Sequence, residues 1–279
     1  MKFTKMHGCG NDYVYIDCFE ETVKDEKATA IKLSDRHFGV GGDGLILIKK
    51  GKAADFEMVM YNADGSRAEM CGNAIRCVAR YVYDKGYVNT AEFSIESMGK
   101  VKYITLTVEN GVVTGVRVDM GAPILKAADI PVVSSGDRVI NNEITVDGRK
   151  FNMTCVSMGN PHAVMFIDRS PREFELEHFG PLFENNSIFP KRVNAEFARV
   201  VDRNNIEMRV WERGTGETLA CGTGTCATVV AAILNGYTDN DVTVHLLGGD
   251  LKIHWSGNES DSVIMTGPAE YVFSGEINL

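Results

Sequence analysis

The feature that most constrains the fold of this chain is an internal repeat. When the sequence is shifted by 150 residues against itself, without a gap from position 56 to position 102, FEMVMYNADGSRAEMCG aligns with IEMRVWERGTGETLACG, and YDKGY aligns with ILNGY. Both copies run in the same order: an apolar strand, a polar loop with glycine, Cys-Gly, a helical segment, glycine and another strand. This order predicts two halves of similar architecture. The identical pairs are Glu57/Glu207, Met58/Met208, Cys71/Cys221, Gly72/Gly222, Gly86/Gly236, Tyr87/Tyr237, Gly99/Gly249 and Lys102/Lys252.

Each Cys-Gly pair marks the start of a helix at the same place in the repeat. Glycine just past the last helical residue is a common C-cap, and Gly86 and Gly236 lie equally far from their cysteines. The segment 223–235 is apolar on nearly all faces, which predicts a buried helix with a sheet wrapped round it. The segment 73–85 is more amphipathic.

Strand-like runs outnumber helices along the chain. ITLTV, VRVDM, VTVHLL and VIMT are examples, and short Asn-Gly or Gly-Asn turns often join such runs, which favours antiparallel or mixed sheets. We therefore expect an α/β (α+β) fold of two pseudo-symmetric halves, each with a mixed or antiparallel sheet round a central helix. The first half covers 1–120, with 268–279 returning to it, and the second covers 121–267.

Composition narrows the class of ligand. The net charge of −9 and the pI near 5.2 argue against nucleic acid or an anionic membrane as a partner, and favour a small molecule. The N-terminus is polar before any apolar stretch, and no segment reaches the roughly 20 apolar residues of a membrane span, so we expect a cytoplasmic protein. The seven cysteines form no C-x-x-C pair and the histidines form no H-x-x-x-H, so we expect reduced thiols and no metal.

Two glycine-rich stretches imitate nucleotide-binding loops. The segment 39–44 matches G-x-G-x-x-G, but the helical pattern ATAIKLSDRHF precedes it and the strand LILIK follows, which reverses the order of a dinucleotide site. The segment 222–227 opens a helix, but about ten residues separate it from the strand EMRVW. Neither G-x-x-x-x-G-K-[ST] nor G-x-S-x-G occurs, so phosphate-loop and serine-hydrolase chemistry have no support.

The two cysteines suggest acid/base chemistry. At a helix N-terminus the unpaired N–H groups and the helix dipole favour the thiolate and lower its pKa. Inversion of a carbon centre needs a base on one side and an acid on the other, and Cys71 and Cys221 supply both if the halves face each other. The N–H groups of Gly72 and Asn73, and of Gly222 and Thr223, would hold a substrate carboxylate.

The same residues resemble diaminopimelate epimerase. NADGSRAEMCGNAIRC, GNPH, WERG-x-G-E-T-x-ACGTGTCA and the N-terminal HG-x-GNDY match that family in order, from residue 5 to about 270. The resemblance implies two α/β halves with the site between them, a homodimer, no pyridoxal phosphate, no other cofactor and no metal. It also implies interconversion of LL- and meso-diaminopimelate in lysine and cell-wall precursor synthesis.

The resemblance also implies roles for individual residues. Cys71 and Cys221 are the acid/base pair, and His162 and Glu212 tune the thiols, Glu212 also orienting the reacting ammonium. The groups that bind the substrate's amino and carboxylate groups are Asn11, Asn62, Asn160, Asn194 and Arg213, with the backbone of Gly72, Asn73, Gly222 and Thr223. Some family members have glutamine where this chain has Gly44, and that glutamine is associated with substrate binding. Gly44 has no side chain to offer, so it is not included in the site.

Two other functions remain open from the residues. One is a related two-cysteine racemase of proline, hydroxyproline or histidine. The other is a thiol-redox protein that uses Cys71 and Cys221 as a switch, which the lack of C-x-x-C weakens.

Overall fold

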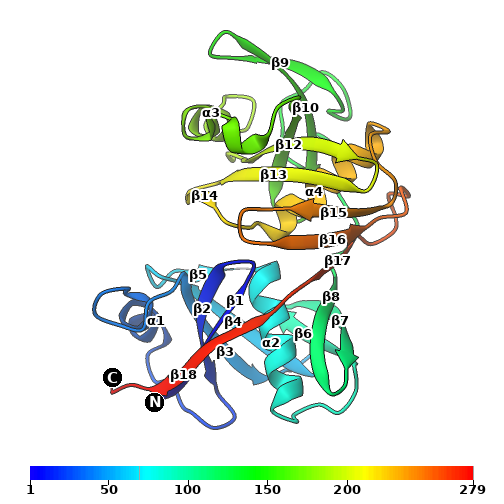
Figure 1. Ribbon diagram of the computed structural model, residues 1–279. Helices are drawn as coiled ribbons and strands as arrows, with labels where there is room; N and C mark the ends of the chain where they lie inside the picture. Colours follow the sequence, from blue (N-terminus) through cyan, green and yellow to red (C-terminus); the bar gives the residue numbers. More distant parts are fainter. Residues whose placement is uncertain (69, 279) are drawn as a thin grey trace. The chain divides into compact units, whose positions relative to one another are not determined.

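The structure is a computed structural model that describes residues 1–68 and 70–278. It divides into two compact units. The first unit contains Met1–Val118 and the C-terminal segment from Thr266, and the second contains Asp119–Met265. Figure 1 shows α2 (cyan) among the strands of the first unit and α4 (gold) among those of the second.

The first unit is a mixed sheet with a helix on each face. β2 pairs parallel with β3, β4 pairs parallel with β6, and the pairs β18–β1, β1–β2, β3–β4, β4–β5, β6–β7 and β7–β8 are antiparallel. The elements are β1 (Lys2–Gly8), β2 (Asn11–Asp17), α1 (Glu26–Ser34), β3 (Gly44–Lys50), β4 (Phe56–Asn62), β5 (Arg67–Ala68), α2 (Gly72–Asp84), β6 (Glu92–Ser97), β7 (Lys100–Glu109), β8 (Val112–Asp119) and β18 (Glu270–Glu276).

Alternation along β2 separates the two faces of this sheet. Val14 and Ile16 join Leu33 of α1 in one apolar cluster. Successive side chains of a strand point to opposite faces, so Tyr13 and Asp17 face α2. The Tyr81 hydroxyl of α2 accordingly donates to Asp17 Oδ2 at 3.2 Å.

The second unit repeats this arrangement. β10–β11, β12–β13, β13–β14 and β15–β16 are antiparallel, and β11–β12 and β13–β15 are parallel, as in the corresponding strands of the first unit. The elements are β9 (Asn142–Val146), β10 (Arg149–Ser157), β11 (Pro161–Phe166), the 3₁₀ turn η1 (Pro171–Glu173), α3 (Leu176–Glu184), β12 (Asn194–Asp202), β13 (Asn205–Glu212), β14 (Gly216–Thr218), α4 (Gly222–Leu234), β15 (Asp241–His245) and β16 (Asp250–His254); β17 (Ile264–Gly267) spans the boundary between the units.

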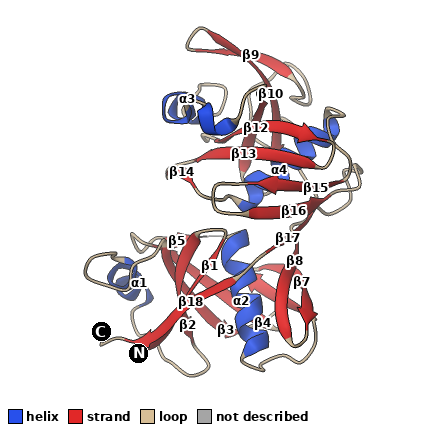
Figure 2. Cartoon of the chain, viewed as in Figure 1, coloured by secondary structure: helices blue, strands red, loops and turns tan. Residues whose placement is uncertain are grey.

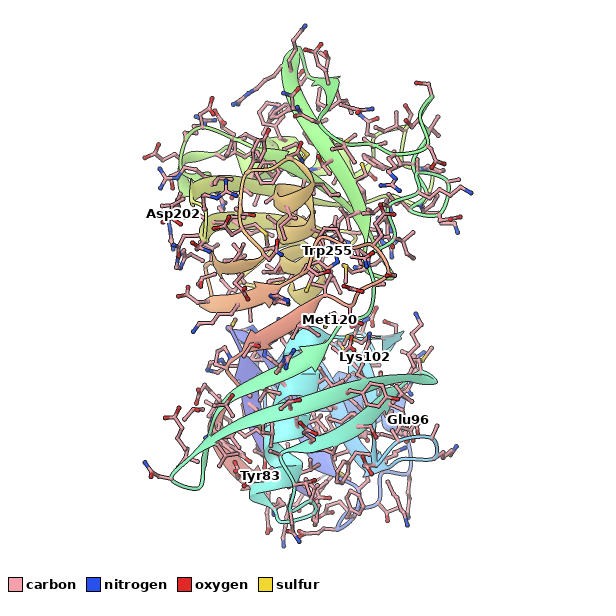
Figure 3. The ribbon with its side chains drawn as sticks, turned by 90° about the vertical axis from the view of Figure 1, so that its right-hand side faces the viewer. Tyr83, Glu96, Lys102, Met120, Asp202 and Trp255 are labelled. Carbon is pink, nitrogen blue, oxygen red and sulfur yellow. The ribbon has the colours of Figure 1, made fainter. Side chains whose placement is uncertain are left out.

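The second sheet also separates two faces. Phe197 packs with Phe179 and Phe183 of α3 in a large aromatic cluster, so Asn194 and Glu196, three residues and one residue before it in the strand, face α4. Figure 2 shows α3 and α4 (blue) against the strands (red) of this unit. Figure 3 shows Asp202 at the outer surface, where its carboxylate accepts from Asn204 N and from Asn205 Nδ2 in the β12–β13 turn.

The structure confirms the expected fold class and both helix starts. Cys71 and Cys221 are the N-cap residues of α2 and α4, with extended backbone at φ −127° and −117°. Gly86 and Gly236 follow the two helix ends with φ of 72° and 71°, the left-handed region that glycine adopts without strain.

One expected helix is shorter than its pattern. The helical pattern ATAIKLSDRHF extends to Phe38, whereas α1 ends at Ser34. The Asp35 carboxylate accepts from His37 N and Phe38 N, so it satisfies backbone groups that a continuing helix would have paired.

Candidate functional site

In the first unit, Cys71 lies in a chain of polar contacts with β2. Its Sγ accepts from Ala74 N at 3.5 Å and donates to Asn11 Oδ1 at 3.2 Å. Asn73 Nδ2 lies 3.4 Å from the same oxygen. Asn11 Nδ2 donates to Asp43 Oδ2 at 2.7 Å, so the amide oxygen of Asn11 is directed at the thiol. This part of the predicted site is therefore assembled within one unit.

An ionic network includes Asp43, the residue that accepts a hydrogen bond from Asn11. Arg36 pairs with Asp12 and Asp43 at 2.8 and 2.9 Å, and Lys5 pairs with Asp12 at 2.6 Å. The guanidinium and ammonium groups outweigh burial and hold the pKa of Asp12 below its usual value. These residues were not predicted from the sequence; the signal for them is the run of charged residues next to the Gly-rich loop 39–44.

A buried arginine holds the first turn of α2. Arg76 is fully buried, and its guanidinium donates to Gly72 O, Asn73 Oδ1 and Pro268 O at 2.9–3.0 Å. The first backbone bond of α2 is Ile75 N to Cys71 O, so the N–H groups of Gly72 and Asn73 precede the intrahelical ladder. That these N–H groups hold a carboxylate stays a prediction.

In the second unit, Cys221 lies among carboxylates. It is buried, with Sγ 3.5 Å from Thr223 Oγ1 and with Glu212 close to the thiol. Thr218 Oγ1 donates to Glu212 Oε1 at 2.5 Å. The first backbone bond of α4 is Thr225 N to Cys221 O, which leaves the N–H groups of Gly222 and Thr223 outside the ladder.

The expected lowering of the thiol pKa is wrong for Cys221. Burial raises its pKa well above the ordinary value, and the charges of Glu212 and Glu196 raise it further. The helix N-terminus favours the thiolate, but desolvation and two carboxylates have the larger effect. Burial likewise raises the pKa of Glu212, although Thr218 and Cys221 donate hydrogen bonds that oppose this.

His162 occupies a fully buried position beside this thiol. Its Nδ1 lies 2.6 Å from Glu196 Oε1 and its Nε2 lies 3.0 Å from Asn160 Oδ1. Asn160 Nδ2 donates to Thr223 Oγ1 at 3.3 Å. Polar contacts therefore run from Glu196 to Cys221. Glu196 was missed from the sequence; the signal for it is a carboxylate two residues after Asn194 in an apolar strand.

Asn194, Arg213 and Asn62 make contacts with neighbouring residues of the chain. Asn194 Oδ1 accepts from Arg213 N at 2.8 Å and Asn194 Nδ2 donates to Pro161 O at 3.0 Å, so Asn194 joins β11 to the turn after β13. The Arg213 side chain is exposed and donates to Lys191 O at 3.0 Å. Asn62 is exposed at the end of β4 and donates to Ser66 Oγ at 3.0 Å.

Two further observations concern metal ligands and membrane spans. Among residues 1–68 and 70–278, no group of three or more His, Cys, Asp or Glu side chains is arranged to hold a metal ion. No helix in the same described part of the chain is long and apolar enough to cross a membrane.

Comparisons with known proteins agree on one family. The family model of diaminopimelate epimerase matches residues 3–126 and 154–272. Curated proteins named diaminopimelate epimerase are 59% identical in Agathobacter rectalis, covering all of both chains, and 54% identical in Acetivibrio thermocellus, covering 100% of this chain and 99% of the relative.

Solved structures agree on the fold. A phenazine biosynthesis protein from Bacillus anthracis superposes with a TM-score of 0.70 at 16% identity, covering 100% of this chain and 99% of the other. A probable proline racemase from Agrobacterium radiobacter superposes with a TM-score of 0.71 at 13% identity, covering 100% and 93%.

Proposed function

Because the chain belongs to the diaminopimelate epimerase family, we propose that it interconverts LL-2,6-diaminopimelate and meso-diaminopimelate without a cofactor, in lysine and cell-wall precursor synthesis. The observation that carries the mechanism is the equivalence of two cysteines: Cys71 and Cys221 are N-caps of corresponding helices in two units with the same strand pairing. The rival two-cysteine racemases share this fold at low identity, whereas the full-length relatives above 50% identity carry the epimerase name.

The proposed reaction is a balanced proton exchange. A thiolate on one side removes the α-proton and becomes a thiol, and the thiol on the other side gives its proton to the opposite face and becomes a thiolate. Total charge is unchanged and the α-carbon is inverted. For this exchange, Cys71 and Cys221 must lie on opposite sides of the substrate α-carbon.

The environment of Cys221 supports its role as the protonated cysteine of the substrate-free enzyme. Burial and the neighbouring carboxylates of Glu212 and Glu196 disfavour its thiolate. We therefore propose that Cys221 carries the proton in a free enzyme with one thiolate and one thiol, and that one turnover in the same direction returns the reverse arrangement.

The helix starts supply the carboxylate site. The N–H groups of Gly72 and Asn73, and of Gly222 and Thr223, precede the hydrogen-bonded ladders, where the positive end of the helix dipole stabilises an anion. As the α-proton leaves, negative charge flows into the carboxylate, so these donors act most strongly in the transition state. We propose that Asn11 and Asn160, each next to a cysteine-bearing helix start, orient the reacting end.

The remaining predicted residues suit the ends of a substrate with two amino-acid groups. Glu212, next to the Cys221 thiol, would accept from the reacting ammonium. Asn62 ends β4, Asn194 begins β12 and Arg213 follows β13, and we propose that they bind the distal amino and carboxylate groups. Arg213 offers a planar fork that matches a carboxylate.

The direct test is an assay of the purified protein in a chelator, with LL-diaminopimelate as substrate. Formation of the meso isomer, with uptake of deuterium at the α-carbon in heavy water, supports the proposal. Proline, 4-hydroxyproline and histidine are the comparison substrates. Inversion of one of these in preference to diaminopimelate would favour the rival racemase, and no α-proton exchange with any of them would contradict an epimerase.

The Glu212 carboxylate is expected to set the alkaline limit of activity. Glu212→Gln removes a negative charge beside Cys221. The thiol is also near the carboxylate of Glu196 on β12, which contacts His162 on β11. Negative neighbours raise a thiol pKa, so their removal lowers it. In a profile of kcat/KM against pH, the alkaline limb should move to lower pH, because Cys221 then loses its proton earlier. An unmoved limb, or one moved to higher pH, would contradict Cys221 as the protonated cysteine.

We also propose that the protein is a homodimer that associates through β18. This strand pairs with β1 on one side, and Tyr271, Val272 and Phe273 expose 39, 52 and 48% of their surface. Exposed apolar and aromatic side chains gathered on one strand form a favourable surface for association. A thiol/thiolate pair needs reducing conditions, so we propose a cytoplasmic location.

Val272→Lys is expected to convert the dimer to a monomer, because a charge at the centre of the β18 surface cannot be buried without a partner. Val201→Lys is the matched control, since Val201 is 50% exposed on β12 in the other unit. Light scattering coupled to size-exclusion chromatography gives the mass of each. A Val272→Lys variant that stays dimeric, or a control that dissociates equally, would place the interface elsewhere.

A further inference from the structure

The second unit contains a buried carboxylate at a place where the first unit has a hydrocarbon. Glu196 pairs with Val210 across β12–β13, and Ile46 pairs with Met60 across β3–β4, so both members of the pair shift by the 150 residues that separate Cys71 from Cys221. Ile46 and Glu196 both have 0% exposure. The fold therefore accepts an apolar side chain at this point, and the carboxylate is a specific feature of the Cys221 side.

The helix that faces this position differs in a matching way. The residue three positions after Cys71 is Ala74, and the residue three positions after Cys221 is Gly224. A Cβ on Gly224 would lie 2.6 Å from Glu196 Oε1 and 3.3 Å from Cys221 Sγ. Glycine at 224 makes room for the Glu196 carboxylate against the first turn of α4, so the two differences from the first unit are coupled.

The hydrogen bonds define which atoms of His162 carry protons. Asn160 Nδ2 donates to Thr223 Oγ1, so Asn160 Oδ1 is the atom that faces His162, and His162 Nε2 must donate to it. At 2.6 Å, His162 Nδ1 and Glu196 Oε1 share one further proton. Glu196 Oε2 is buried without a hydrogen-bond partner in the described part of the chain, which disfavours an isolated carboxylate there.

We propose that Glu196 is a positioning residue of the epimerase site: it holds His162 in the form that donates from Nε2, and His162 in turn orients the Asn160 amide and the Thr223 hydroxyl beside Cys221. This inference rests on the proposed function. Without Glu196, His162 can protonate Nδ1 instead, and Nε2 then accepts rather than donates. The Asn160 amide would then rotate. Its oxygen, rather than its N–H group, would lie next to Thr223 and the substrate carboxylate.

Two substitutions separate hydrogen bonding from charge. Glu196→Gln removes the charge but places an amide where N–H can donate to His162 Nδ1, so His162 keeps its proton on Nε2. Glu196→Ile removes the hydrogen bond and installs the side chain that the first unit has at Ile46. The double variant Glu196→Ile with Gly224→Ala reproduces the Ile46 and Ala74 pair of the first unit, and tests the same loss if the single variant does not fold.

The activity measurement is kcat/KM for LL-diaminopimelate. Glu196→Ile and the double variant should lose roughly tenfold to a hundredfold, the effect of one hydrogen bond to a charged group, mainly in kcat because the carboxylate charge grows in the transition state. Glu196→Gln should stay within about threefold of the wild type. Glu207→Gln is the matched control: Glu207 lies on β13 between buried residues that face α4, and it pairs with Arg199 at 3.0 Å.

A second measurement does not depend on substrate. In the full chain with ¹⁵N-labelled histidine, long-range ¹H–¹⁵N spectra report which ring nitrogen of His162 holds hydrogen, and His162→Gln assigns its signals among the six histidines. The wild type and Glu196→Gln should show protonated Nε2, and Glu196→Ile should show a different or exchanging distribution.

The outcomes separate this inference from the proposed function. If the wild type does not epimerise diaminopimelate, the proposed function fails and this role fails with it. If the wild type is active, full activity of Glu196→Ile overturns the role of Glu196 alone. Equal losses in Glu196→Gln and Glu196→Ile, or unchanged His162 nitrogens in Glu196→Ile, also overturn it, since either result would separate activity from the position of the imidazole proton.

Discussion

Serine in place of either Cys71 or Cys221 is expected to lower kcat/KM for LL-diaminopimelate by about 10²- to 10⁴-fold, because each substitution removes one of the two proton-transfer groups. Serine is a preferred N-cap residue, so the starts of α2 and α4 should be preserved. Its hydroxyl ionises too weakly to replace a thiolate at neutral pH. Circular dichroism and thermal unfolding should match those of the wild type.

The control for the cysteine substitutions is Cys18→Ser. Cys18 follows β2 in the first unit, is half-buried, and burial raises the pKa of its thiol to about 11. Its replacement should leave kcat/KM unchanged. Near-wild-type turnover by either Cys71→Ser or Cys221→Ser would remove that residue from the proton exchange.

Oxidation of the substrate-free protein with diamide is expected to abolish activity, and a thiol reductant should restore it. The proposed reaction requires both sulfurs to reach one carbon atom, and we expect sulfurs with that reach to form a disulfide when no substrate separates them. A disulfide needs Cα atoms about 4.4–6.8 Å apart. Thiolate attack on the diazene gives an adduct, the second thiolate displaces the hydrazine, and the two electrons of the new bond end on the oxidant.

Peptide mapping of the oxidised protein identifies the linked pair. The Cys71–Cys221 link should form in the wild type and in Cys18→Ser, and bound diaminopimelate should slow it. Cys71→Ser should form no link to Cys221. A different linked pair in the inactive protein, or inactivation with both thiols unmodified, would contradict sulfurs that face a common substrate.

Several elements of the fold were predictable because they depend on local chemistry. Gly86 and Gly236 end their helices because a left-handed C-cap favours glycine, and the apolar pattern of 223–235 identifies a buried helix. The repeat predicted the shared architecture because equivalent strands carry equivalent patterns. The extent of α1 was overestimated because apolar periodicity does not register the capping carboxylate of Asp35.

The sequence by itself determined the family, the fold class and the placement of Cys71 and Cys221 at two helix starts, since each depends on residue order and spacing. Tertiary structure decided what surrounds each thiol. The burial of Cys221 and the approach of Glu212 and Glu196 reverse the expected pKa direction. The contact of Glu196 with His162 joins strands 34 positions apart in the chain. Desolvation and charge–charge interactions depend on distances through space, and those distances exist only once the strands have paired and α4 has packed against them.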